Sequence, residues 1–165
     1  MMAEKTLSPG EPDAMRAALA EHPFCSDIGA DHLSEMASGA AEVRYPIGAF
    51  VFQRGRPADA LYLITDGTVS LEVADPAREP LTIETLHGGD ALGWSWLFPE
   101  RTWRFDARCL SDVAAIAVDA EHLRALIEDD PEFGRDLVLR ISRVVMDRLV
   151  YSRSQIVDIQ HHDHR

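Results

Sequence analysis

Apolar residues along the chain follow three successive patterns, and each pattern predicts a different kind of element. Between Asp13 and Gly39 they recur every three or four residues, which predicts two short helices separated at His22-Pro23. Between residues 43 and 118 apolar and polar residues alternate, which predicts strands. From Asp119 onward the helical spacing returns. The order helix, strand, helix indicates an α+β fold.

The middle region contains six or seven short strands separated by Gly, Pro or Asp. Many short alternating strands with turn residues between them are typical of an antiparallel roll or sandwich. Asp66-Gly67 predicts a hairpin, because this dipeptide favours the tight turns that join antiparallel neighbours. The polar stretch from Asp75 to Pro80 predicts a loop.

Two helices are predicted after the strands. Asp119 is a good N-cap for the first, and Asp129-Asp130-Pro131 ends it and begins the second. Apolar residues then recur at helical spacing as far as Ile159. A helix this long in a small domain needs a partner, and a second copy of the chain is the simplest one. We therefore expect a homodimer through the C-terminal helix; the alternative is a helix that folds back along its own strands.

Charge and composition narrow the partners of this 165-residue chain. Its net charge of −12 repels nucleic acids and anionic membrane surfaces. No apolar run reaches the roughly 20 residues of a membrane span, and the N-terminus lacks a signal-peptide pattern, so we expect a cytoplasmic protein. Cys25 and Cys109 are too few for a disulfide framework and are expected to be buried free thiols.

One stretch, from Gly88 to Thr102, concentrates residues suited to binding an anion. Its three glycines let the backbone approach a ligand closely, and Leu92–Phe98 has the spacing of one or two helical turns, whose first N–H groups are unpaired. Arg101 adds a fixed positive charge. The stretch therefore predicts a cradle for a phosphate or carboxylate. The alternative is that Trp94 and Trp96 simply plug the core.

Catalytic and metal-binding motifs are not found in this sequence. It contains no nucleophile turn with a Ser–His–Asp order, no Walker loop and no metal-ligand spacing among the strands. We therefore expect no enzymatic activity, no cofactor and no bound metal. His161, His162 and His164 have metal-ligand side chains, but we expect them to lie in a solvated chain end.

The order of glycines and apolar residues resembles that of the cyclic-nucleotide-binding domain. The matching segments are 46–48, 52–55, 61–64, 67–69 and Gly89-Asp90-Ala91-Leu92-Gly93. The chain is similar, over about residues 20–158, to the sensor half of the catabolite-activator and fumarate-nitrate-regulator superfamily. The resemblance implies an antiparallel double-stranded β-roll flanked by helices. It also implies a phosphate-binding cassette at the glycine-rich stretch, and a ligand such as cAMP or cGMP that the long C-terminal helix contacts.

The resemblance assigns ligand-binding roles residue by residue. Gly93 matches the glycine that opens the cassette helix, Arg101 the phosphate-binding arginine, and Thr102 the small residue after it. Arg148 and Ser152 match the ligand-facing arginine and hydroxyl of the last helix. The expected ligand-binding residues are Gly93, Trp94, Ser95, Trp96, Arg101, Thr102, Arg148 and Ser152.

Two tryptophans depart from the family pattern. Trp94 replaces a glutamate that accepts the ribose hydroxyl, and Trp103 replaces a small residue, so the anion half of the pocket is retained and the sugar half is not. Three outcomes stay open: a cyclic nucleotide bound differently, with Trp94 or Trp96 stacked on its base; another anionic or aromatic ligand; and a degenerate, ligand-free roll that acts as a dimeric protein-interaction module. Arg104 is a competing partner for the anion.

The expected function is that of a small-molecule sensor domain. Family transcription factors carry a winged helix-turn-helix after the long helix, whereas this sequence ends at Arg165, so we expect no direct DNA binding and an unknown downstream partner protein. An iron–sulfur cluster would need more cysteines than two distant ones. The expected organisation is a tail at 1–12, one domain at 13–159 with the β-roll at 43–118 and the last helix at 131–159, and a tail at 160–165.

Overall fold

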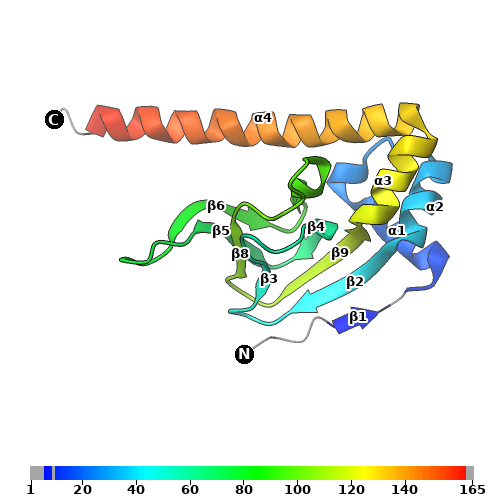
Figure 1. The fold of residues 1–165 in the computed structure, drawn as a ribbon, viewed down its shortest axis with the longest axis horizontal. Coiled ribbons are helices and arrows are strands. Elements are labelled where there is room, and N and C mark those ends of the chain that lie inside the picture. Colours follow the sequence, from blue (N-terminus) through cyan, green and yellow to red (C-terminus); the bar gives the residue numbers. More distant parts are fainter. Residues whose placement is uncertain (1–5, 9, 163–165) are drawn as a thin grey trace. The chain divides into compact units, whose positions relative to one another are not determined.

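The computed structural model describes the backbone of residues 6–8 and 10–162 and the side chains of residues 10–150. The chain divides into two units, 1–126 and 127–165, and each is described by itself. The first unit contains two antiparallel sheets with helices, and the second contains one long helix (Figure 1). The α+β class predicted from the sequence is confirmed.

Among the described residues, nine strands form two sheets in which every neighbouring pair is antiparallel. The five-stranded sheet has the order β1-β2-β9-β4-β7, and the four-stranded sheet has the order β3-β8-β5-β6. This is the predicted β-roll. The strands are β1 (Thr6–Ser8), β2 (Ala40–Tyr45), β3 (Phe50–Phe52), β4 (Ala60–Asp66), β5 (Thr68–Val73), β6 (Leu81–His87), β7 (Ala91–Leu92), β8 (Asp106–Cys109) and β9 (Val113–Asp119).

The helices begin and end close to the residues predicted from the sequence. They are α1 (Pro12–Glu21), α2 (Ala30–Ser38), α3 (Ala120–Asp129) and α4 (Pro131–His162), with the 3-10 turns η1 (Pro23–Cys25) and η2 (Ser95–Leu97). The Asp119 carboxylate accepts a hydrogen bond from the His122 N–H (2.9 Å) and caps α3. The Asp130 carboxylate accepts one from the Phe133 N–H (3.1 Å) and caps α4.

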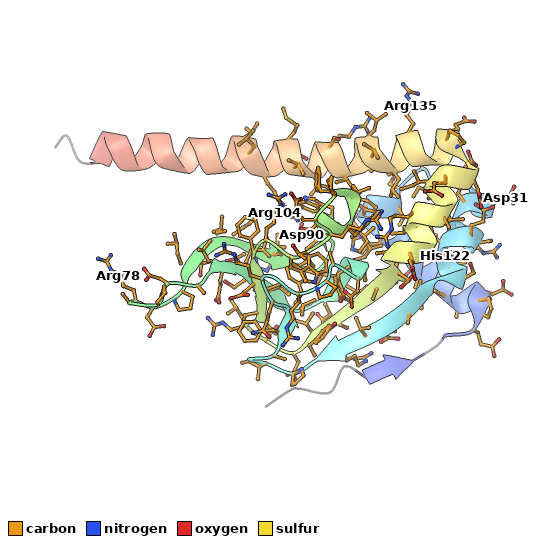
Figure 2. The ribbon with its side chains drawn as sticks, viewed as in Figure 1. Asp31, Arg78, Asp90, Arg104, His122 and Arg135 are labelled. Atoms are coloured by element: carbon orange, nitrogen blue, oxygen red, sulfur yellow. The ribbon has the colours of Figure 1, made fainter. Side chains whose placement is uncertain are left out.

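The first unit has its helices at one end of the sheets and the β5–β6 hairpin at the other (Figure 1). His122 fastens α3 to α2, because its Nε2 lies 2.6 Å from the carbonyl oxygen of Glu35. Its position between the two helices is labelled in Figure 2. His122 therefore has a structural role.

The predicted hairpin at Asp66-Gly67 is wrong, although the turn itself is present. β4 and β5 flank the turn but belong to different sheets, so the turn is a corner of the roll. Gly67 has φ +97°, and a Cβ at this position would meet the backbone oxygen of Asp112. The dipeptide Asp66-Gly67 therefore predicted the tight turn correctly, but not which strands pair. Which strands pair is decided by β8 and β6, which lie on either side of β5.

The predicted N-terminal tail, residues 1–12, contains the strand β1. β1 pairs antiparallel with β2, with Leu7 opposite Val43, and so extends one edge of the five-stranded sheet. At the other end, α4 continues to His162, three residues beyond the predicted limit. Residues 1–5, 9 and 163–165 lie outside the described part, so the two tails stay predictions.

The interior of the roll is mainly apolar. Leu61, Leu63 and Ile64 of β4 are fully buried, and Cys25 and Cys109 are buried free thiols, as predicted. Burial raises the pKa of the Cys109 thiol to about 11, so this sulfur stays protonated and is a poor nucleophile. No helix of the described residues is long and apolar enough to cross a membrane.

His22 is a buried, neutral histidine that joins the N-terminal helices to the sheet. Its Nδ1 accepts a hydrogen bond from the Phe24 N–H (3.2 Å), so the proton lies on Nε2, which donates to the Ile64 carbonyl (2.9 Å). Burial lowers its pKa below 6.5, opposed by the Ile64 bond and by the nearby charge of Asp90. Protonation would place a second donor against the Phe24 N–H.

We expect the free energy of unfolding to fall as the pH is lowered through 6.5. Because the folded-state pKa of His22 is lowered, the unfolded chain binds the proton more readily. The stabilisation is complete above pH 6.5 and is lost as the pH falls toward the lowered pKa, at up to about 1.4 kcal/mol per pH unit. Urea unfolding between pH 7.5 and 5.5 should show a weaker pH dependence in His22→Gln than in His87→Gln, an exposed control. Equal slopes would contradict the assignment.

Candidate functional site

The glycine-rich stretch from Gly88 to Thr102, here called the cassette, forms a strand and a tight turn. The predicted helix over Leu92–Phe98 is wrong, because Leu92 ends β7 and only Ser95–Leu97 form the 3-10 turn η2. Phe98 has φ −103° and ψ 155°, the extended conformation favoured before a proline, and this ends the turn. A single turn aligns too few N–H groups to be a helix-terminal anion site.

Trp96 is a core residue of the cassette. Its side chain has 0% of its surface exposed, and its Nε1 donates a hydrogen bond to the Gly93 carbonyl (2.8 Å). The indole therefore satisfies its one polar group within the cassette and leaves no ring face open to a ligand. For Trp96, the alternative stated in the sequence analysis, a tryptophan that fills the core, is therefore the one observed.

Trp94 differs from Trp96 in its exposure. It immediately precedes η2, with φ −124° and ψ 12°, and its side chain is only half-buried, as is that of Ser95. Trp94 therefore keeps indole surface that a ligand can reach. Of the two indoles that the sequence offered for stacking, the geometry favours this one.

Trp103 fills the space beside the cassette glycine. Its indole is buried and stacks on Phe52, with ring centroids 3.9 Å apart and 11° between the ring planes. A Cβ on Gly93, which has φ +90°, would lie 2.9 Å from the Trp103 ring. The bulk gained at position 103 is thus accommodated because position 93 has no side chain.

A short antiparallel ribbon fixes the end of the cassette. The Gly55 N–H donates to the Trp103 carbonyl (2.8 Å), and the Trp103 N–H donates to the Arg56 carbonyl (2.9 Å). The Ala58 N–H donates to the Arg101 carbonyl (2.8 Å). A bridge between Pro57 and Thr102 lies between these bonds. Residues 54–58 and 101–103, here called the ribbon, therefore hold Arg101 and Thr102 in one orientation.

Arg101 has a backbone conformation that is unusual for a residue with a large side chain. Its φ of +48° is in the left-handed region, which side chains as large as arginine rarely adopt. Its side chain is exposed, and among the described residues its guanidinium has no hydrogen-bond or ion-pair partner. Thr102 beside it is half-buried. An unpaired cation held on a constrained backbone is available to an anion.

Six of the eight predicted site residues lie in the cassette, between Gly93 and Thr102. Arg148 and Ser152 lie on α4, in the second unit, and the Ser152 side chain is outside the described residues. Their part in a site stays a prediction.

One charge pair elsewhere in the roll joins a buried carboxylate to a partly exposed arginine and has a structural role. The Arg108 guanidinium of β8 donates three hydrogen bonds of 2.6–3.2 Å to the Glu72 carboxylate of β5, which is almost fully buried. The hydrogen bond to Glu72 raises the pKa of Arg108. Both groups are satisfied by each other. Among the described residues, no three His, Cys, Asp or Glu side chains lie close enough to hold a metal ion.

The glycine turns, the two-sheet roll and the cassette agree with a known family. The family model described as "Cyclic nucleotide-binding domain" matches residues 42–130, more than half of the chain. The chain belongs to the cyclic nucleotide-binding domain family. The match begins in β2 and ends just before α4, so it includes the cassette and the ribbon.

Two relatives of known name share this region. Over 117 residues, 71% of this chain, it is 28% identical to the CRP-like cAMP-activated global transcriptional regulator of Mycobacterium tuberculosis. Over 140 residues, 84% of this chain, it is 29% identical to glutaminase 1 of Bradyrhizobium diazoefficiens. The chain spans half of the regulator and 22% of the glutaminase. The relationship is therefore to a regulatory domain within longer proteins.

Solved structures confirm the fold. A cyclic nucleotide-binding domain from Methylobacillus flagellatus matches 93% of this chain and 88% of its own, with a TM-score of 0.76 at 16% identity. At this identity the likeness establishes the α+β roll and nothing about the ligand.

The two cassette tryptophans should differ in their contribution to stability. We expect Trp96→Ala to lower the free energy of unfolding by about 3–5 kcal/mol, because it empties a fully buried site and removes a hydrogen bond. Trp94→Ala, at a half-buried position, should cost less than half as much. Urea unfolding followed by circular dichroism measures both. Equal costs would show that Trp94 is as much a part of the core as Trp96.

Proposed function

We propose that this chain is a regulatory sensor that binds a small anionic ligand, of the cyclic-nucleotide class, at the cassette and passes the signal to a partner protein. The observation that carries the proposal is Arg101. The resemblance matches it to the family's phosphate-binding arginine, and its backbone has a left-handed conformation within the ribbon and an exposed side chain. The family match supplies the ligand class.

The ligand would be held differently from a ribose-anchored nucleotide. Trp94 replaces the carboxylate that accepts the ribose hydroxyl, and a lost hydrogen bond to a buried hydroxyl costs about 1–3 kcal/mol, or one to two decades of affinity. A half-buried indole offers a stacking face instead. The proposed site therefore takes the phosphate at Arg101 and a flat base against Trp94. Thr102 adds a hydroxyl next to the arginine.

A second copy of the chain is the proposed partner of α4. Six described apolar side chains of this helix are between 41% and 63% exposed: Val138, Leu139, Val145, Met146, Leu149 and Val150. Their spacing of three, four and seven residues is that of helices that pair. The charge of −12 also argues against direct contact of this chain with DNA, so the signal would pass through another protein.

A ligand-free roll that serves as a dimeric interaction module is the second candidate. The observation that favours it is the packing of Trp96 and Trp103, which fill the space around Gly93 with two buried indoles. The same α4 surface would then carry the whole function. This chain matches only 22% of the length of the relative named glutaminase 1. Such a partial match supports a module that accompanies different effector proteins.

Arg101→Ala should abolish stabilisation by nucleotides. A ligand at 100 times its Kd stabilises the folded state by about 2.7 kcal/mol, which appears as a rise in Tm. We expect cAMP or cGMP to raise the Tm of the native protein and to have no effect on Arg101→Ala. Arg78→Ala removes one exposed charge at the β5–β6 hairpin and should respond as the native protein does. No shift with any cyclic nucleotide in the native protein would favour the ligand-free module.

Val145→Glu should convert a dimer into monomers. A carboxylate placed among the exposed apolar side chains of α4 would be desolvated by pairing, which is unfavourable. Sedimentation equilibrium measures the mass, and circular dichroism checks that the helix is intact. Asp147→Lys is the control, because it changes an exposed charge two residues from both Val145 and Leu149, on the side of the helix opposite these two residues. An unchanged dimer in Val145→Glu would remove this face of α4 from the interface.

A further inference from the structure

An open surface pocket of about 480 Å³, called the cavity below, is lined partly by the ribbon and shares Thr102 with the proposed cassette site. Its walls include Arg54, Glu100, Thr102, Trp103, Arg104 and Phe105. Small-molecule sites have volumes of roughly 300–1,000 Å³, so the space fits a ligand of nucleotide size. We propose that this cavity is a second binding site, for a small organic dianion attached to a flat ring.

The ribbon explains why these residues meet. Gly55 and Trp103 are joined by a backbone hydrogen bond, and Pro57 is bridged to Thr102. The loop after β3 and the loop before β8 are thereby held side by side. The Asp106 carboxylate also accepts a hydrogen bond from the Arg54 N–H (2.8 Å), which fixes the backbone that carries the arginine. The cavity is thus built on a constrained backbone.

Two of the residues that line the cavity are arginines, whose guanidinium groups could bind an anion. Among the described residues, the Arg54 guanidinium has no ion-pair partner. Arg104 pairs with Glu100 at 3.3 Å, but their side chains are 61% and 69% exposed, and such exposed pairs are weak. A phosphate or carboxylate can therefore replace Glu100. Two guanidinium groups suit a dianion better than a single negative charge.

The remaining walls favour a flat ring next to the charge. Phe105 is 40% exposed at the cavity and offers a ring face, and the Thr102 hydroxyl is a further donor. The whole chain has a net charge of −12, whereas the residues that line this cavity include two arginines and one carboxylate and so have a net positive charge. A local positive charge attracts small anions.

This site does not rest on the proposed function. Gly93, Trp94, Trp96 and Arg101 do not line the cavity, and Thr102 is the residue that both sites share. The two proposals therefore fail separately: loss of cAMP binding in Arg101→Ala reports on the cassette, and the experiment below reports on Arg54 and Arg104.

Isothermal titration calorimetry of the full chain tests the cavity with three probes. These are 5′-AMP, which has a dianion and a ring; inorganic phosphate, which lacks the ring; and adenosine, which lacks the charge. We expect 5′-AMP to bind at least ten-fold more tightly than phosphate, and adenosine not to bind. In the double variant Arg54→Ala, Arg104→Ala the 5′-AMP affinity should fall about ten- to a hundred-fold.

Two further variants complete the test. Phe105→Ala should remove most of the preference for 5′-AMP over phosphate. Arg78→Ala, at the hairpin tip well away from Arg104 (Figure 2), should leave 5′-AMP binding within two-fold of the native value. All the substituted side chains are exposed, so an unchanged Tm shows that each variant is folded. The proposal is overturned if 5′-AMP does not bind, or if Arg101→Ala removes its binding while the double variant retains it.

Discussion

Three backbone hydrogen bonds between residues 54–58 and 101–103 hold the candidate site together. Each contributes only about 1 kcal/mol to the free energy of folding, but together they join two loops that are distant in the sequence. The same bonds place Trp103 against Phe52 and hold Arg101 in its left-handed conformation. The geometry of the cassette therefore depends on a ribbon that contains no conventional helix or strand.

The three tryptophans in and next to the cassette differ in burial. Trp96 and Trp103 are buried and replace empty space around Gly93 with aromatic bulk. Trp94 stays half-buried, at the position that the resemblance matches to the family's ribose-binding glutamate. A site that has lost a hydrogen-bond acceptor for a sugar and gained ring surface is suited to flat, negatively charged molecules.

Positive charge gathers on the ribbon of an otherwise acidic protein. Arg54, Arg56, Arg101 and Arg104 are exposed within or next to it, although the whole chain carries only 16 Lys and Arg. Such a local cluster attracts small anions while the net charge of −12 repels polyanions. The described part of α4 offers a different surface, apolar and evenly spaced, that suits another helix. The two surfaces fit a domain that senses a small anion and acts through a protein.

The sequence by itself determined the element order, the family, the cap at Asp119, the helix boundary at Asp129-Asp130-Pro131, and the burial of Cys25 and Cys109. Each of these follows from local propensity or from periodic burial, which neighbouring residues encode. The tertiary structure alone decided that Asp66-Gly67 turns between sheets, that Trp96 is buried while Trp94 is reachable, and that Arg54 and Arg104 share a cavity. These depend on contacts between residues up to about 50 positions apart, and no local pattern specifies which distant backbone a loop will pair with.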